Sequence, residues 1–301
     1  EGDSQKWKGS AGIGLLTSRL QLEGPLRKGK TTVVGSARTT YSDWILGLLP
    51  EDSEYSGGKA DFLDANLGVT HRFNSRNTLQ AFGYFARDKF VFGADTTFHY
   101  QNYNASLIFK HRSDNVGTLD LSGGYDHFDN MVSVYSWNYA AYDISTFIRQ
   151  AFLKGNRTLP LNDSHILSYG VHLLGYGLDP GIQRPYGEES SIRERSLDRE
   201  YAMEPSLYAS DSWTLTDRFS LDGGIRLSGF YAPGPGAFYA GPEYRLSGKF
   251  TLADNLSIKG GINTMRQYIH LISNTSAISP MDTWKLSDSD IRLTKGWQAA
   301  S

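Results

Sequence analysis

One octapeptide of this chain matches the phosphate-binding pattern G-x-x-x-x-G-K-[ST]. It occupies positions 24–31 and reads Gly-Pro-Leu-Arg-Lys-Gly-Lys-Thr. In nucleotide-binding proteins this pattern joins a strand to a helix whose N-terminus faces the phosphates. Here Thr31 and Thr32 are followed by Val33 and Val34, and β-branched residues favour a strand. We therefore expect a hairpin turn, with its cationic side chains in water or beside lipid headgroups, and no nucleotide site.

The histidine and serine residues show none of the familiar catalytic spacings. The chain contains no His-Glu-x-x-His and no Gly-x-Ser-x-Gly pattern, which are signatures of zinc and serine hydrolases. It also has no cysteine, so disulfides and thiolate metal sites are excluded. We predict no catalytic residue, no cofactor and a protein that is not an enzyme. A barrel enzyme with a Ser/His site at the membrane edge is an alternative that no motif supports.

Four aspartates fall in segments that the sequence predicts as external loops: Asp126, Asp129, Asp288 and Asp290. Carboxylates can bind calcium with help from backbone carbonyls, but these lack the glycine and the distal glutamate of an EF-hand loop. We expect solvent-exposed carboxylates and no metal site.

The candidate ligand-binding residues are aromatic and arginine side chains near the ends of predicted strands. A ring together with a guanidinium can bind many bulky ligands through stacking, cation–π contact and paired hydrogen bonds. The alternative role for each residue is packing within a loop or at a membrane interface. The six candidates are Trp44, Trp137, Arg184, Tyr186, Arg266 and Trp284.

The elements that would position these residues are strands. In the segment 219–230, Phe219, Leu221 and Ile225 share one face while Asp222 and Arg226 share the other, which is the period of a β-strand. The pattern recurs over roughly ten residues at a time, as is typical of transmembrane β-barrels. The mean hydropathy of −0.41 agrees, because half of each barrel strand lines a polar lumen. There is no apolar run of about eighteen residues that would predict a helical span.

The alternation predicts an all-β fold, a transmembrane antiparallel β-barrel, with about fourteen strands. Short turns alternate with long connections, and outer-membrane barrels place their long loops outside the cell. The long connections are 45–60, 128–141, 178–199 and 271–291. The predicted strands are 6–13, 15–24, 31–44, 61–73, 78–91, 98–112, 117–127, 142–154, 164–177, 200–214, 218–231, 237–252, 256–270 and 292–300.

Aromatic residues cluster where the predicted strands would leave the hydrocarbon. Aromatic rings that have both an apolar and a polar part favour the membrane–water interface. The alternative is that these rings form the core of a soluble β-sandwich. A net charge of −2 gives no reason to expect a nucleic-acid partner. The clustered residues are Tyr41, Trp44, Tyr100, Tyr103, Trp213, Phe230, Tyr231, Phe238, Tyr239 and Tyr268.

Two stretches resemble TonB-dependent receptors of the Bacteroidetes type. The first is 16–44, which contains Leu-Thr-Ser-Arg-Leu-Gln-Leu-Glu-Gly-Pro-Leu-Arg-Lys-Gly-Lys and resembles the early barrel strands of that family. The second is 262–292, which contains Asn-Thr-Met-Arg-Gln-Tyr-Ile-His-Leu and Pro-Met-Asp-Thr-Trp-Lys-Leu-Ser-Asp and resembles a mid-barrel strand and loop. The second match is the more specific of the two.

The resemblance implies an outer-membrane transporter with a barrel of about twenty-two strands and a plug in its lumen. All 301 residues would then form one partial barrel domain, with the plug and the C-terminal strands outside this sequence. The implied cargo is a bulky nutrient such as an iron chelate, vitamin, peptide or glycan. The implied partners are outer-membrane lipid, TonB through a part of the polypeptide not present here, and a surface lipoprotein or another barrel. The alternatives are a barrel without a plug that scaffolds a surface or secretion complex, and a passive pore.

Overall fold

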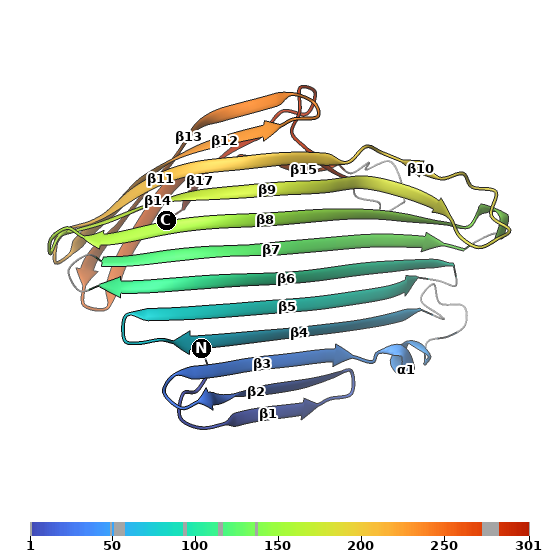
Figure 1. The fold of residues 1–301 in the computed structure, drawn as a ribbon, viewed down its shortest axis with the longest axis horizontal. Coiled ribbons are helices and arrows are strands. Elements are labelled where there is room, and N and C mark those ends of the chain that lie inside the picture. Colours follow the sequence, from blue (N-terminus) through green and yellow to red (C-terminus); the bar gives the residue numbers. More distant parts are fainter. Residues whose placement is uncertain are drawn as a thin grey trace.

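One antiparallel sheet contains almost all of the strands (Figure 1). The computed structural model describes residues 2–48, 50, 58–92, 95–113, 117–135, 138–272 and 283–300. The order across the sheet follows the chain from β1 to β9, continues through β11 to β14 and ends at β17, while the short β10 pairs with β9. A separate hairpin consists of β15 and β16. Among the described residues, no helix is long and apolar enough to cross a membrane.

The bounds of these elements are as follows. The first half of the chain contains β1 (Lys8–Ile13), β2 (Thr17–Arg27), β3 (Thr31–Thr40), α1 (Asp43–Leu46), β4 (Lys59–Arg72), β5 (Asn77–Phe92), β6 (Thr96–Ser113), β7 (Gly117–Val134), the 3₁₀ turn η1 (Asn138–Ala140) and β8 (Tyr142–Pro160). The second half contains β9 (His165–Pro185), β10 (Arg195–Ser196), β11 (Glu200–Thr216), β12 (Phe219–Ala232), β13 (Ala237–Ala253), β14 (Leu256–Gln267), β15 (Ile269–Ile272), β16 (Thr283–Leu286) and β17 (Thr294–Ala300).

The all-β, antiparallel fold class is confirmed, and each of the fourteen predicted strands overlaps one strand of the main sheet in the same order. The predicted hairpin turn at 24–31 is also confirmed. β2 ends at Arg27, the amide of Lys30 donates to the carbonyl of Arg27 at 2.9 Å, and Gly29 has a φ of 69°. A left-handed residue at this point suits glycine, and the chain enters β3 instead of a helix.

Four strand ends were predicted wrongly by four residues or more, and one of them is the end of β8, which extends to Pro160 rather than to 154. β3 ends at Thr40, and Trp44 lies in α1 rather than in a strand. β7 and β9 extend to Val134 and Pro185, so Asp129 lies in β7 and not in a loop, together with Asp126, which the predicted strand 117–127 already contained. The sequence hid these extensions because Asp129, Asp179 and nearby prolines interrupt the alternation. Ladder pairing with β8 nevertheless continues to satisfy the backbone groups there.

Ladder partners point to the same side of a sheet, so the pairing assigns every side chain to one of two faces. The two faces differ in chemistry. The face that we call outer carries exposed apolar side chains along its middle. The other, the inner face, carries Gln150, Lys154, Arg226 and Glu243. The exposed outer residues include Leu107, Leu121, Leu153, Val171, Leu173, Leu207, Leu227, Leu246 and Ile258.

Aromatic residues border the apolar part of the outer face at both ends. Tyr201 and Trp213 mark the two borders on β11, about twelve residues apart. At about 3.4 Å per residue this is about 40 Å along the strand, or about 30 Å along the membrane normal for a tilt of about 45°. That height matches a hydrocarbon layer. The upper belt, near the long connections, contains Tyr103, Tyr125, Tyr201, Tyr231 and Phe238; the lower belt contains Tyr169, Trp213, Phe219 and Phe250.

The main buried cluster lies on the inner face, where the β15–β16 hairpin packs against β9 and β11. Phe230 is fully buried and stacks on Tyr268, with ring centroids 4.7 Å apart. Both rings were predicted to lie at a membrane interface, and this is wrong. Phe230 belongs to the inner face because it alternates with Tyr231, which is exposed on the outer face. The cluster consists of Tyr176, Leu178, Ala202, Phe230, Ala232, Ala237, Tyr268 and Leu286.

Candidate functional site

The β15–β16 hairpin is fixed to the inner face by polar contacts, and the carboxylate of Glu200 makes two of them. Glu200 stands at the start of β11, and its Oε1 lies 2.6 Å from Nζ of Lys285. Its Oε2 accepts a hydrogen bond from the amide of Leu286 at 2.9 Å. Lys285 also pairs with Asp288 at 2.8 Å, and the hydroxyl of Tyr239 donates to the carbonyl of Asp288 at 2.5 Å. A connection that the sequence predicts as an external loop therefore folds back onto the sheet.

The charges of the hairpin support this arrangement. Burial alone would lower the pKa of Lys285, but hydrogen bonds to Asp288 and Glu200 outweigh it and raise that pKa above 10.5. Burial alone would raise the pKa of Asp288, but the amide of Ile291, Lys285 and the amide of Asp290 together hold it below 3.8. Burial lowers the pKa of His270 below 6.5, so its neutral form is favoured in the folded hairpin.

His270 also contacts a serine, with Nε2 lying 2.8 Å from Oγ of Ser287. Ser287 is completely buried, so a substrate could not reach its hydroxyl. The other ring nitrogen of His270 lies 3.5 Å from Oγ1 of Thr294 and not beside a carboxylate. We interpret the pair as an anchor of the hairpin. Among the described residues, no group of three or more His, Asp or Glu side chains is placed to hold a metal ion.

A pocket lies between the hairpin and the inner face of β5–β8. Trp284 and Ile269 line it from the hairpin, and Tyr84, Phe128 and Ile148 line it from the sheet. Its polar lining includes the amides of Asn102, Asn104 and Gln150 and the carboxylate of Asp126, which belong to the inner face of these strands. Asn104 donates a hydrogen bond to Asp126. Among the described residues that line this aromatic–amide pocket there is no lysine or arginine.

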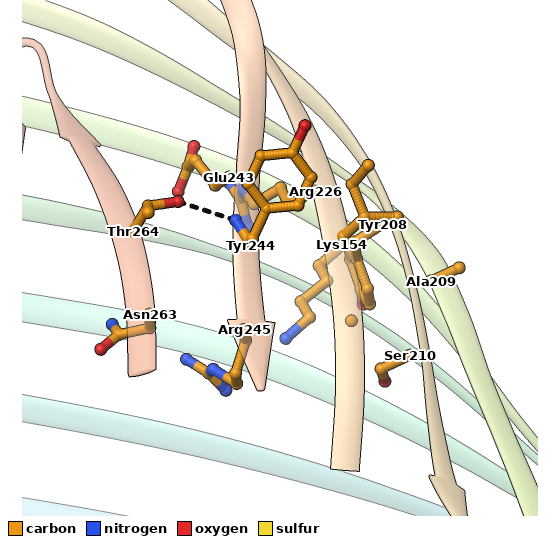
Figure 2. A pocket seen from close by; sticks show the side chains of 12 residues that line it. Lys154, Tyr208, Ala209, Ser210, Arg226, Glu243, Tyr244, Arg245, Asn263 and Thr264 are labelled. Carbon is orange, nitrogen blue, oxygen red and sulfur yellow. Dashed lines mark hydrogen bonds between the residues drawn. The ribbon is translucent and has the colours of Figure 1, made fainter. Parts of the chain in front are cut away.

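A second hollow of about 350 Å³ lies further along the inner face, across β8, β11, β12, β13 and β14 (Figure 2). Lys154, Arg226, Glu243 and Arg245 line it, and we call it the charged groove. Arg226 lies 3.6 Å from Oε1 of Glu204 and 3.3 Å from Nδ1 of His172.

Tyr208 also lines the groove, and its hydroxyl donates to Oδ1 of Asn156 at 2.9 Å. Figure 2 shows Tyr244 and Thr264 on neighbouring strands, joined by the bond from the amide of Tyr244 to Oγ1 of Thr264. The groove is thus tied together by hydrogen bonds that cross several strands.

The six candidate residues do not form one site. Trp284 lines the aromatic–amide pocket. Arg266 donates from Nη1 to the carbonyl of Ala240 at 3.1 Å. Trp44 donates from Nε1 to the carbonyl of Leu15 at 2.9 Å, at the end of the sheet where the long connections lie.

Arg184 and Tyr186 lie at the end of β9 and just beyond it. Arg184 is 3.9 Å from Glu194. The ring of Tyr186 packs edge-on against Tyr135, with centroids 4.5 Å apart. Trp137 lies outside the described residues. The ligand-binding role of all six therefore stays a prediction.

Sequence reasoning missed the pocket residues on β5–β8. Tyr84, Asn104, Asp126 and Gln150 lie within long strands, whereas the six candidate residues were expected near strand ends and in loops. The signal that could have found them is their shared face, since alternate residues of a strand point to the same side and these four are ladder partners in one row. No sequence pattern shows that the hairpin folds back over them.

Comparison with known proteins shows similarity in structure only. No protein-family model matches the chain. No curated protein matches it in sequence. Among solved structures, the copper transporter OprC superposes with a TM-score of 0.68 at 10% identity, covering 89% of this chain and 46% of that one.

Two siderophore receptors give the same result. PirA from Acinetobacter baumannii has a TM-score of 0.68 at 11% identity, covering 99% of this chain and 50% of its own. PirA from Pseudomonas aeruginosa has a TM-score of 0.66 at 16% identity, with 99% and 53% covered. The chain thus spans about half the length of these structures. Over that length, it has the barrel fold of these outer-membrane transport receptors.

Proposed function

We propose that this chain is part of the barrel of an outer-membrane, TonB-dependent transporter that imports a bulky nutrient. The observation that carries the proposal is the β15–β16 hairpin, which folds onto the inner face and makes a pocket with β5–β8. An apolar outer face between two aromatic belts supports the membrane location. The fold shared with siderophore and copper receptors supports the type of transporter.

We propose further that the receptor is of the Bacteroidetes type, because the two stretches 16–44 and 262–292 resemble that type. The cargo would be an iron chelate, a vitamin, a peptide or a glycan. TonB would act through a part of the polypeptide outside this sequence, and a surface lipoprotein or another barrel would be a further partner. Trp284 is the candidate residue whose position in the pocket fits ligand contact best.

Uptake measured in cells that carry the native polypeptide tests this proposal. Labelled iron chelates, cobalamin, peptides and oligosaccharides would be compared in wild-type cells, in a deletion strain and in cells treated with a proton uncoupler. We expect uptake of one class to need both the polypeptide and the proton gradient. Trp284→Ala should raise the KM for that cargo, while Trp297→Ala, on an exposed residue of β17, should not.

Uptake that continues unchanged under the uncoupler would replace active transport by a passive pore. If no cargo depends on the polypeptide and a partner protein copurifies with it, the barrel is a scaffold and the proposal fails.

A further inference from the structure

Two arginines share one ring on the outer face, next to the upper aromatic belt. Arg149 lies on the same face of β8 as the exposed Leu153, and it pairs across the ladder with His127 and Gly177. Arg199 directly precedes β11. The guanidinium carbons of Arg149 and Arg199 lie 4.3 Å and 5.5 Å from the ring centroid of Phe147. Cation–π contact thus holds both groups at one place.

The protein holds each arginine by Nε, the nitrogen nearest its aliphatic stem. Nε of Arg149 donates to Nδ1 of His127 at 3.3 Å, and Nε2 of His127 lies 2.5 Å from Asp129. Nε of Arg199 lies 3.2 Å from Oδ2 of Asp179, whose side chain is 1% exposed. Among the described residues, the terminal nitrogens of both arginines have no hydrogen-bond partner.

This arrangement leaves the terminal N–H groups of two exposed guanidinium groups available as hydrogen-bond donors. The Arg199 side chain is 55% exposed, and the two nearby carboxylates are already engaged, Asp179 by Arg199 and Asp129 by His127. A planar fork matches a phosphate group, which it can bind through two parallel hydrogen bonds.

The position of Arg149 and Arg199 along the membrane normal identifies the source of that phosphate. Arg149 lies in the ladder row that passes through Tyr103 and His127, so it stands at the upper belt. An unpaired guanidinium is unfavourable in hydrocarbon, but at this level the membrane itself presents headgroup anions. The upper belt lies toward the long connections, which face outside in outer-membrane barrels.

We propose that the Arg149–Arg199 pair binds a phosphate group of an outer-leaflet lipid. The Phe147 ring sets the spacing of the two forks, while His127 and Asp179 fix their orientation. This inference needs the membrane location but not the transport activity, so either proposal can fail without the other.

Native mass spectrometry of the whole native polypeptide in detergent tests the site, with synthetic bis-phosphorylated lipid A and its dephosphorylated form as probes. We expect the wild type to retain the phosphorylated lipid about ten-fold better. The double variant Arg149→Gln/Arg199→Gln should lose that preference. The double variant with lysines should keep part of it, since charge remains without the fork. Arg218→Gln, at an exposed short turn, is the matched control and should bind as the wild type does.

The single variants keep the test valid if the double variant does not fold, and each should lose about three-fold or more in retention. Equal retention of both lipids by the wild type would overturn the proposal. So would full retention by both single variants. If millimolar inorganic phosphate displaces the lipid, the site binds free anions and the lipid assignment is wrong.

Discussion

The two faces of the same strands differ in how the exposure of a side chain relates to its polarity. On β8, Leu153 is 66% exposed and apolar, whereas the adjacent Lys154 is charged and lines the charged groove. On β12, Tyr231 is exposed, whereas the adjacent Phe230 is fully buried beneath the hairpin. In a water-soluble sheet the buried face would be the apolar one throughout. Under the proposed membrane location, exposure and burial alone do not indicate polarity, because lipid would be the solvent of the outer face.

The largest effect is expected at Phe230. Phe230→Ala would leave a cavity beneath the hairpin and should destabilise the protein by about 3–5 kcal/mol. Tyr231→Ala, one residue away on the outer face, should cost far less because its ring is already exposed. Urea unfolding in lipid vesicles would measure both. Equal losses would show that the two faces are not energetically distinct at this level.

A charge in the middle of the outer face should have the next largest effect. Leu153→Arg should destabilise the folded state in lipid by about 2–4 kcal/mol, the amount found for arginine at the midplane of a barrel. Lys154→Arg is the matched control, and the same unfolding measurement should show little change because that side chain faces the inner, polar side. A Leu153→Arg variant as stable as the wild type would remove this part of the outer face from the membrane.

Glu200→Gln should loosen the hairpin without unfolding the sheet. The change removes the negative partner of Lys285 and weakens the acceptor for the amide of Leu286. We expect a loss of about 1–3 kcal/mol in hairpin docking. Hydrogen exchange of the peptide 283–288 should therefore accelerate, while β8 keeps its protection. Faster exchange in β8 as well would mean that Glu200 stabilises the whole sheet.

The smallest effect is the pH dependence of hairpin docking. His270 has a folded pKa below 6.5, so its contribution is complete above pH 6.5 and falls as the pH drops through that range. Asp288, with a lowered pKa, contributes above pH 3.8 and loses its contribution below it. Lys285, with a raised pKa, contributes below pH 10.5 and loses its contribution as the pH rises through its folded pKa.

Exchange of 283–288 should thus be slowest, after correction for intrinsic rates, between about pH 7 and pH 10. His270→Gln should remove the change near pH 6 and leave the change below pH 4. A profile that is flat from pH 5 to pH 8 would show that His270 does not couple to docking.

The alternation of residues made most of the sheet predictable. In β12, the alternation predicts both the strand and the side to which each residue points, with Phe219, Leu221 and Ile225 on one face and Asp222 and Arg226 on the other. A barrel strand cannot slip by one residue without exposing charge to lipid. The upper parts of β7 and β9 were not predictable in this way. There Asp129 and Asp179 lie on the outer face and break the pattern, although the ladder continues.

The candidate site was less predictable than the fold. The residue type of Trp284 and its place in a long connection make it a candidate, and it does line a pocket. The partners of that pocket come from β5–β8, more than a hundred residues earlier in the chain, and are brought near only by the fold-back of the hairpin. That fold-back depends on Glu200, Lys285 and Asp288, whose pairing has no local signature in the sequence.

Cysteine accessibility along β8 tests the central claim, that lipid covers one face of this sheet and water the other, most directly. The chain has no cysteine of its own, so single cysteines at positions 149–156 can be labelled one at a time in native outer membranes. We predict that a charged, water-soluble maleimide labels positions 150, 152, 154 and 156 more readily than 151, 153 and 155. Labelling without alternation, or with the opposite alternation, would contradict this account.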